Sequence, residues 1–291
     1  MNRRHIARET LEALQRGSYS TSEGETIELT AWQQAAEQGS VLHRPADVPQ
    51  LLQVFKQAAG EPAEIQVYQA TTLEAVTKLA AEFKRVGCLN FASARNPGGG
   101  FLGGSQAQEE SLARSSGLYP CLVQFREMYD HNTRTARTGL YSDYAIYSPG
   151  VPVFRDDAGN WLPQPVRVDF ITSPAVNAGA LSRNNPELLP ELVSTMQRRI
   201  RQVLAIAALH KCEVLVLGAW GCGVFQNNPH QIASLFAEAL AEANIRGRFQ
   251  RIDFAVFDSK PPHETLRAFE KAFAKESKVL TPDAGLALKA S

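Results

Sequence analysis

The chain has 291 residues, of which 44% are hydrophobic and 21% charged, a composition typical of folded globular proteins that argues against a disordered chain. Its 30 Lys and Arg side chains balance its 30 Asp and Glu side chains, so no overall field attracts the protein to nucleic acid or to an anionic membrane, and any polyanion must be bound locally. No stretch approaches the roughly 18 consecutive apolar residues of a membrane span.

The four cysteines are widely spaced and include no CxxC pair, which argues against a disulfide framework and a structural zinc site. They are Cys88, Cys121, Cys212 and Cys222. Residues 1–14 contain only scattered apolar side chains and lack the apolar run of a secretory signal. We therefore expect an intracellular, cytoplasmic protein.

Residues 1–60 are predicted to form a helical N-terminal extension packed on a core, and residues 61–291 the main part of a single domain. Apolar residues occur at helical spacing twice in this extension. They are Ile6, Leu11 and Leu14, then Val48, Leu51, Leu52 and Phe55. From about residue 64, strand-like runs alternate with helical patterns, which predicts an α/β layer fold.

The predicted strands cover residues 65–68, 88–92, 144–147, 151–154, 166–172, 214–217 and 252–257, and residues 73–84 are predicted to be helical. Asp157 to Asn160 has the composition of a hairpin turn.

Two longer helices carry start signals, Asn185-Pro186 and Asn228-Pro229. The first should run through Leu209, with a buried stripe at Leu189, Leu192, Met196, Ile200, Val203 and Ala207. Its Arg198, Arg199 and Arg201 are expected to lie on a solvated face. A terminal helix is predicted over residues 264–275, followed by a mobile tail from about residue 278.

The strongest functional signal is the loop after the strand at 88–92, where five of the seven residues from Gly98 to Gly104 are glycine. Glycine costs backbone entropy, so this concentration suggests that main-chain N–H groups approach a ligand closely or adopt positive φ. The loop leads into a helix predicted over residues 109–117, whose N-terminus favours an anion. We therefore predict a phosphate-binding loop.

Three other interpretations of this loop fit its residues less well. Gly98-x-Gly100-x-x-Gly103 matches a dinucleotide fingerprint, but residues 93–97 separate it from the strand and the loop continues past Gly104 before any helix. A Walker A motif fails because no Lys-Ser or Lys-Thr follows the glycines. A merely flexible loop would make the second glycine loop a coincidence.

That second loop, Gly218 to Asn228, also lies between an apolar strand and a capped helix. In open α/β sheets the usual ligand position is a crevice at the carboxyl ends of strands, so we expect the two loops to face one crevice with a diphosphate between them. Phe225 would stack on a base or ribose, or else be an ordinary core aromatic. Cys222 is better explained as a small packing residue than as a nucleophile, and Trp220 as packing under its loop.

Gly98-Gly99-Gly100, seven intervening residues and Gln108-Glu109-Glu110 resemble the signature of the bacterial-type poly(ADP-ribose) glycohydrolases, which are macrodomain proteins. Residues 170–177 and 218–225 resemble two further segments of that family in the same order. The resemblance extends over roughly residues 60–275. It implies a macrodomain-like three-layer α/β/α fold with a mixed central sheet.

The resemblance also implies cleavage of the ribose–ribose O-glycosidic bond of poly(ADP-ribose), with ADP-ribose released mainly from chain ends and no metal or cofactor. Glu110 would be the catalytic acid, Glu109 would orient a ribose hydroxyl and Gln108 would support the pair. The remaining substrate contacts would be Asn96, Gly98, Gly99, Gly100, Gly221, Cys222, Gly223, Val224 and Phe225. The family's role is reversal of ADP-ribosylation on proteins, including after DNA damage, and we expect a monomer without membrane or general nucleic-acid binding.

Adjacent helical residues point about 100° apart, so Glu109 and Glu110 should have different roles. The acid must be protonated near neutral pH, whereas a helix N-terminus favours the anion. We expect burial under the ligand and repulsion from the diphosphate to raise the pKa of Glu110. Otherwise, the two acids would simply be a solvated first turn.

The main alternative to an enzyme is a module that binds ADP-ribose without cleaving it, because both need the glycine loops and only the enzyme needs Glu110. An NAD-dependent oxidoreductase would need the Rossmann context that the loop lacks. Mono-ADP-ribosylated protein or nucleic acid stays open as the substrate, as does activation of the water by Glu110 or by a substrate phosphate.

Overall fold

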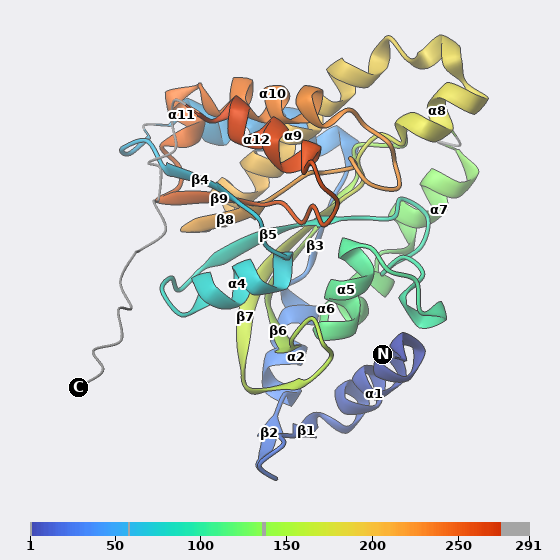
Figure 1. Ribbon diagram of the computed structural model, residues 1–291, viewed down its shortest axis with the longest axis vertical. Helices are drawn as coiled ribbons and strands as arrows, with labels where there is room; N and C mark the ends of the chain where they lie inside the picture. Colours follow the sequence, from blue (N-terminus) through green and yellow to red (C-terminus); the bar gives the residue numbers. More distant parts are fainter. Residues whose placement is uncertain (1, 58, 136–137, 275–291) are drawn as a thin grey trace.

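The computed structural model describes residues 2–57, 59–135 and 138–274, which form a seven-stranded mixed sheet between two helical layers (Figure 1). This confirms the predicted three-layer α/β/α architecture. The strand order is β3-β6-β7-β5-β8-β9-β4. The strands are β3 (Val41–His43), β4 (Glu64–Tyr68), β5 (Val86–Phe91), β6 (Ala145–Arg155), β7 (Trp161–Ser173), β8 (Val214–Leu217) and β9 (Arg251–Ala255).

The direction of the strands determines where a ligand can be bound. Strands β7, β5, β8, β9 and β4 are mutually parallel, while β6 is antiparallel to both β3 and β7. The carboxyl ends of the parallel strands therefore share one edge, and the loops that leave this edge lead into helices on both faces.

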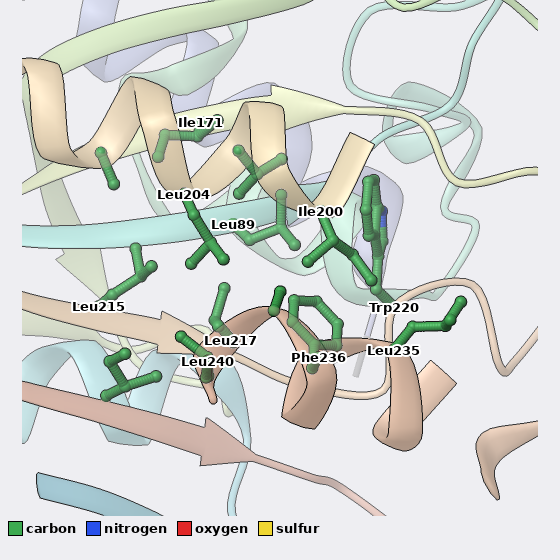
Figure 2. Packing of buried hydrophobic residues seen from close by; sticks show 14 of the residues in the cluster. Leu89, Ile171, Ile200, Leu204, Leu215, Leu217, Trp220, Leu235, Phe236 and Leu240 are labelled. Atoms are coloured by element: carbon green, nitrogen blue, oxygen red, sulfur yellow. The ribbon is translucent and has the colours of Figure 1, made fainter. Parts of the chain in front are cut away.

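Alternating residues of the central strands are buried against the two helical layers. On β5 and β8, Leu89, Leu215 and Leu217 pack with one layer, whereas Cys88 and Val216 pack with the other. Both faces are thus covered, which is why these strands are continuous apolar runs. Figure 2 shows the contact with the first of these layers, where the leucines pack against side chains of α9 (Glu191–Leu209) and α10 (Pro229–Leu240).

Helices of the first layer include α3 (Val48–Leu51), α8 (Ala178–Asn184), α9 (Glu191–Leu209), α10 (Pro229–Leu240), α11 (Ala243–Arg246) and α12 (Glu264–Ala272). Helices of the second are α2 (Thr30–Gly39), α4 (Thr72–Ala80), α5 (Gln108–Ser115), α6 (Leu118–Val123) and α7 (Arg126–Arg134). None of the described helices is both long and apolar enough to cross a membrane.

The first sixty residues contribute to the main sheet as well as to its surroundings. Helix α1 (Arg3–Arg16) is followed by a hairpin of β1 (Ser18–Ser20) and β2 (Thr26–Glu28), and then by α2. Strand β3 then pairs with β6 at one end of the seven-stranded sheet.

Several local predictions were wrong in detail. The strands predicted at 144–147 and 151–154 are one strand, β6, with an irregularity between Ser148 and Val151 where Gly150 has φ +55°. The turn at 157–160 between β6 and β7 is confirmed. Asn228 caps α10 through its side chain, as predicted, whereas Asn185 makes no such bond and precedes only a short 3₁₀ turn. Helix α9 begins later, at Glu191, and Leu189 is 38% exposed.

The end of the chain is only partly covered. Helix α12 ends at Ala272 rather than at residue 275, and the tail predicted to be mobile lies outside the described residues.

The prediction of a solvated arginine face on α9 was wrong for Arg199. This guanidinium is fully buried and donates to Asp143 Oδ1 at 2.8 Å and to the carbonyls of Leu140 and Pro174 at 2.6 and 3.2 Å. Because Asp143 also pairs with the half-exposed Arg198, the carboxylate joins a surface cation to a buried one. Arg199 therefore ties α9 to the segments that flank β6 and β7.

Candidate active site

The two glycine-rich loops line one cleft of about 800 Å³, as the sequence predicted. The loop from β5 to α5 contributes Ser93, Asn96, Gly99 and Gly100, and α5 contributes the side chains at its N-terminus. The loop from β8 to α10 contributes residues 219–225. Both loops leave the carboxyl edge of the sheet from neighbouring strands, which explains why they meet.

The predicted residues are not all part of this lining. Those that line the cleft are Asn96, Gly99, Gly100, Gln108, Glu109, Glu110, Gly221, Cys222, Gly223, Val224 and Phe225. Gly98 is buried behind them and has φ +70°, so its glycine is needed for the turn itself.

Glu110 is the carboxylate that reaches the cleft in a half-buried position. Its Oε1 accepts a hydrogen bond from the backbone N–H of Gly100 at 3.0 Å. In the described part of the chain, no protein group donates a hydrogen bond to its Oε2. One oxygen is therefore fixed by the loop, while the other is available to a ligand.

Gly99 separates the two carboxylates and fits between them only because it lacks a side chain. A Cβ at this position would lie 2.9 Å from Cδ of Glu110 and 3.2 Å from Oε2 of Glu109, and φ is +60°. Although the two side chains leave a helix in different directions, both carboxylates thus lie against the same glycine. The first loop and the start of α5 form one tightly packed unit.

Glu109 is almost fully buried and is held on both oxygens by the protein. Its Oε2 accepts from the backbone N–H of Ser93 at 2.6 Å, and its Oε1 accepts from Asn90 Nδ2 at 3.2 Å. Burial raises the pKa of Glu109 to about 8, against the opposing effect of these hydrogen bonds, and the neighbouring Glu110 raises it further. Burial by the protein itself thus raises the pKa of Glu109, which the sequence did not predict.

The side chain of Gln108 joins α5 to β5 and α4. Its Oε1 accepts from the N–H of Phe91 at 2.9 Å, and its Nε2 donates to the carbonyl of Leu89 at 2.8 Å and to Thr72 Oγ1 at 3.3 Å. These contacts hold the N-terminus of α5 at the end of β5. They support the two glutamates that follow.

The second loop presents backbone donors to the cleft. Gly221 has φ +74°, and a Cβ there would lie 2.6 Å from both Ala175 Cβ and Asn227 Nδ2. Asn227 is buried and donates to the carbonyls of Val176 and Gly221 at 2.7 and 3.0 Å, which fixes the loop. The backbone N–H groups of Gly223, Val224 and Phe225 donate no hydrogen bond to the backbone of the described residues. Three consecutive free donors of this kind suit a phosphate.

The side chains of the second loop have distinct environments. Trp220 is fully buried and points between α9 and α10, as Figure 2 shows, so it packs under the loop as predicted. Cys222 packs against the core, and burial raises the pKa of its thiol to about 12, which argues against a nucleophile. Val224 is 77% exposed at the cleft, while Phe225 is half-buried and contacts Tyr141.

The cleft also contains residues that the sequence did not reveal. Thr71 and Thr72 at the start of α4 line it, together with Phe257 and Asp157. Thr71 Oγ1 donates to Asp157 Oδ2 at 2.5 Å, which connects α4 to the hairpin between β6 and β7. The capping box of Thr71 and Glu74 directly after β4 was a signal that would have located the first of these residues.

Within the described ranges, no three His, Cys, Asp or Glu side chains are grouped closely enough to hold a metal ion. The cleft offers the half-buried carboxyl group of Glu110, the buried carboxyl group of Glu109 and backbone donors of the second loop.

Comparison with known proteins gives a consistent result. Residues 7–156 match the family described as the microbial-type PARG catalytic domain. No curated protein sequence matches the chain.

Solved structures extend the similarity over most of the chain. The poly(ADP-ribose) glycohydrolase (PARG) from Thermomonospora curvata is 46% identical, with a TM-score of 0.88 over 93% of this chain and 99% of that one. Its complex with the inhibitor ADP-HPD is 45% identical, with a TM-score of 0.86 over the same shares. The Deinococcus radiodurans enzyme in complex with ADP-ribose is 44% identical, with a TM-score of 0.81 over 86% and 99%.

Proposed function

The chain belongs to the microbial-type poly(ADP-ribose) glycohydrolase family, and from this we propose that it hydrolyses the ribose–ribose O-glycosidic bond of poly(ADP-ribose), with Glu110 as the acid. The observation that carries the proposal is that Glu110 lines the same cleft as residues 223–225, whose backbone N–H groups have no acceptor among the described residues. A diphosphate held by these donors would place the adjoining ribose at the carboxyl group.

Glu110 would act through its two oxygens. The oxygen that faces the cleft would give its proton to the departing 2′-oxygen as an oxocarbenium-like state forms at the anomeric carbon. The other accepts from Gly100 N–H, and this bond and the helix N-terminus would stabilise the carboxylate that results. Water then completes the hydrolysis, activated by this carboxylate or by a substrate phosphate.

Glu109 would hold the reacting ribose. With a pKa of about 8 it is mostly protonated at pH 7 and adds little negative charge beside the substrate diphosphate. The protonated carboxyl group can donate a hydrogen bond to a ribose hydroxyl, while Ser93 and Asn90 fix the carboxyl group in place. Gln108 would support this arrangement from behind, and Asn96, an exposed residue of the cleft lining, would contact the ribose.

The test is release of ADP-ribose from labelled poly(ADP-ribose) by the wild type and by Glu110→Gln, with Glu61→Gln as a control at an exposed residue outside the cleft. We expect Glu110→Gln to release ADP-ribose at least 100-fold more slowly than the wild type, and Glu61→Gln to release it at the wild-type rate. Glu110→Gln should still bind ADP-ribose, because its second loop is intact. Equal release by all three proteins would remove Glu110 from the mechanism. Tight binding without release by the wild type would identify a non-catalytic ADP-ribose-binding module instead.

We further propose a monomer that acts in the cytoplasm on ADP-ribosylated proteins, including those modified after DNA damage. All four cysteines lie in the described residues and are unpaired, as is usual in a reducing compartment. Residues 1–60 and 61–291 would unfold as one unit, because β3 is part of the main sheet. Light scattering and a single cooperative melting transition would test the monomer and the single unit.

A further inference from the structure

We propose that the exposed Arg3 and Arg4, with the buried Arg114 adding positive charge beside them, form a basic rim that binds the diphosphate of the second unit of the polymer, on the leaving-group side of the scissile bond. The inference rests on the proposed function and identifies what the enzyme contacts beyond the terminal ADP-ribose. It would make the enzyme favour a polymer over a single ADP-ribosyl group.

The rim begins where the cleft ends. Gln106 lines the cleft, its Nε2 donates to Ser111 Oγ at 3.3 Å, and its Oε1 accepts from the guanidinium of Arg114. Arg114 also donates to the carbonyl of Ser105 at 2.6 Å. The cleft wall beside Glu110 is therefore continuous with the first arginine of the rim.

Helix α1 brings the other two arginines to the outer side of the first loop. Arg4 Nε donates to the carbonyl of Gly103 at 2.8 Å. A Cβ on Gly104, which has φ +83°, would lie 3.0 Å from Arg4 Cγ and 3.7 Å from Arg3 Cβ, so this glycine permits the close approach of the helix. Figure 1 shows the N-terminal end of α1 beside the loop before α5, away from α10.

The exposed arginines of the rim are not neutralised by ion pairs within the described residues. Arg114 is 4% exposed and pairs with carbonyl oxygens rather than with a carboxylate. Burial and repulsion from Arg3 lower its pKa, although attraction by the Glu110 carboxylate opposes them. Arg3 and Arg4 are exposed and have no ion pair in the described part of the chain, while the two acids of α1 contact His5 and Arg8. In a protein without net charge, this local excess favours an anion.

The covalent structure of the substrate supplies that anion at the required place. The bond to be cleaved joins the anomeric carbon of the terminal unit to the 2′-oxygen of the next adenosine ribose, and the same ribose carries a diphosphate on its 5′-carbon. With the terminal diphosphate on the second loop, the next one lies a single ribose beyond Glu110. The guanidinium fork suits such an oxyanion.

The experiment compares Arg3→Glu with the wild type on two substrates. One is poly(ADP-ribose), and the other is ADP-ribose linked at its anomeric carbon to a neutral alcohol, which has no second diphosphate. Arg16→Glu is the matched control, because Arg16 is an exposed arginine on the same helix about 20 Å away. Thermal unfolding of each variant verifies that the fold is retained.

For Arg3→Glu we expect a roughly threefold to tenfold rise in KM on the polymer with little change in kcat, and a weaker dependence of kcat/KM on salt. Both variants should cleave the neutral-alcohol substrate like the wild type. An unchanged KM on the polymer, or an equal rise for Arg16→Glu, would overturn the rim while leaving the proposed function intact. If the wild type cleaved neither substrate, the proposed function would be overturned, and this inference with it.

Discussion

Gly99→Ala should disable the enzyme because the glycine is packed between its two carboxyl groups. The added methyl would have to occupy a point 2.9 Å from Cδ of Glu110 and 3.2 Å from Oε2 of Glu109. The backbone cannot easily move away, because the N–H of Gly99 donates to the carbonyl of Asn96 at 2.9 Å. The methyl group therefore displaces Glu110, the half-buried carboxylate.

The magnitude has two parts. Alanine in the left-handed conformation costs about 1–2 kcal/mol, and loss of the bond from Gly100 N–H to a charged carboxylate costs about 1.5–3 kcal/mol. We expect a destabilisation of about 2.5–5 kcal/mol in total. Displacement of the catalytic group by about 1 Å would lower activity on the order of 100-fold.

The assays are urea unfolding and release of ADP-ribose from the polymer. Gly103→Ala is the control, since Gly103 belongs to the same loop, has no positive φ and has open space around its Cβ position. It should be close to the wild type in both assays. Wild-type activity in Gly99→Ala, or an equal loss in Gly103→Ala, would show that this packing does not position Glu110.

Three further predictions concern separate parts of the molecule. Gly223→Val should weaken ADP-ribose binding at least tenfold in calorimetry without lowering the melting temperature, because Gly223 has open space around it but lines the cleft; Gly103→Val should leave binding unchanged. The pKa of Glu109 is about 8 in the folded protein against 4.5 for the ordinary group, so folding takes up a proton between these values. The wild type should then lose stability relative to Glu109→Gln as pH rises from 5 to 8, by up to about 1.4 kcal/mol per pH unit in urea titrations, and parallel profiles would contradict the assignment. Arg199→Leu should lower the free energy of unfolding by about 3–5 kcal/mol, because it removes the buried partner of Asp143 and the donor to the carbonyls of Leu140 and Pro174, whereas Arg198→Leu, at a half-exposed partner of the same carboxylate, should cost less than about 1 kcal/mol.

The sequence predicted best those elements whose pattern is local. Strand β8 has the predicted bounds, since a fully buried parallel strand is a short apolar run between polar residues. The break predicted inside β6 was wrong because Pro149 and Gly150 suggest a turn, although a long antiparallel strand absorbs them as an irregularity. Strand β3 was not predicted, since three residues carry no usable periodicity. The role of Arg199 depends on Asp143, a partner 56 positions away.

The same distinction applies to the site. Both glycine loops and the two glutamates lie in continuous segments, and the convergence of the loops was expected from their places at the carboxyl ends of strands. Asp157 lines the cleft and contacts Thr71, 86 positions away, which no local pattern reveals. The raised pKa of Glu109 results from its burial, which depends on segments far apart in the sequence.

The place of β3 at the end of the sheet has a consequence for shortened forms of the protein. Removal of residues 1–60 would uncover the hydrogen-bonding edge of β6, an eleven-residue strand with a largely buried sequence. Such an unprotected border invites pairing with another copy, so a shortened protein would self-associate or precipitate even though both glutamates were intact.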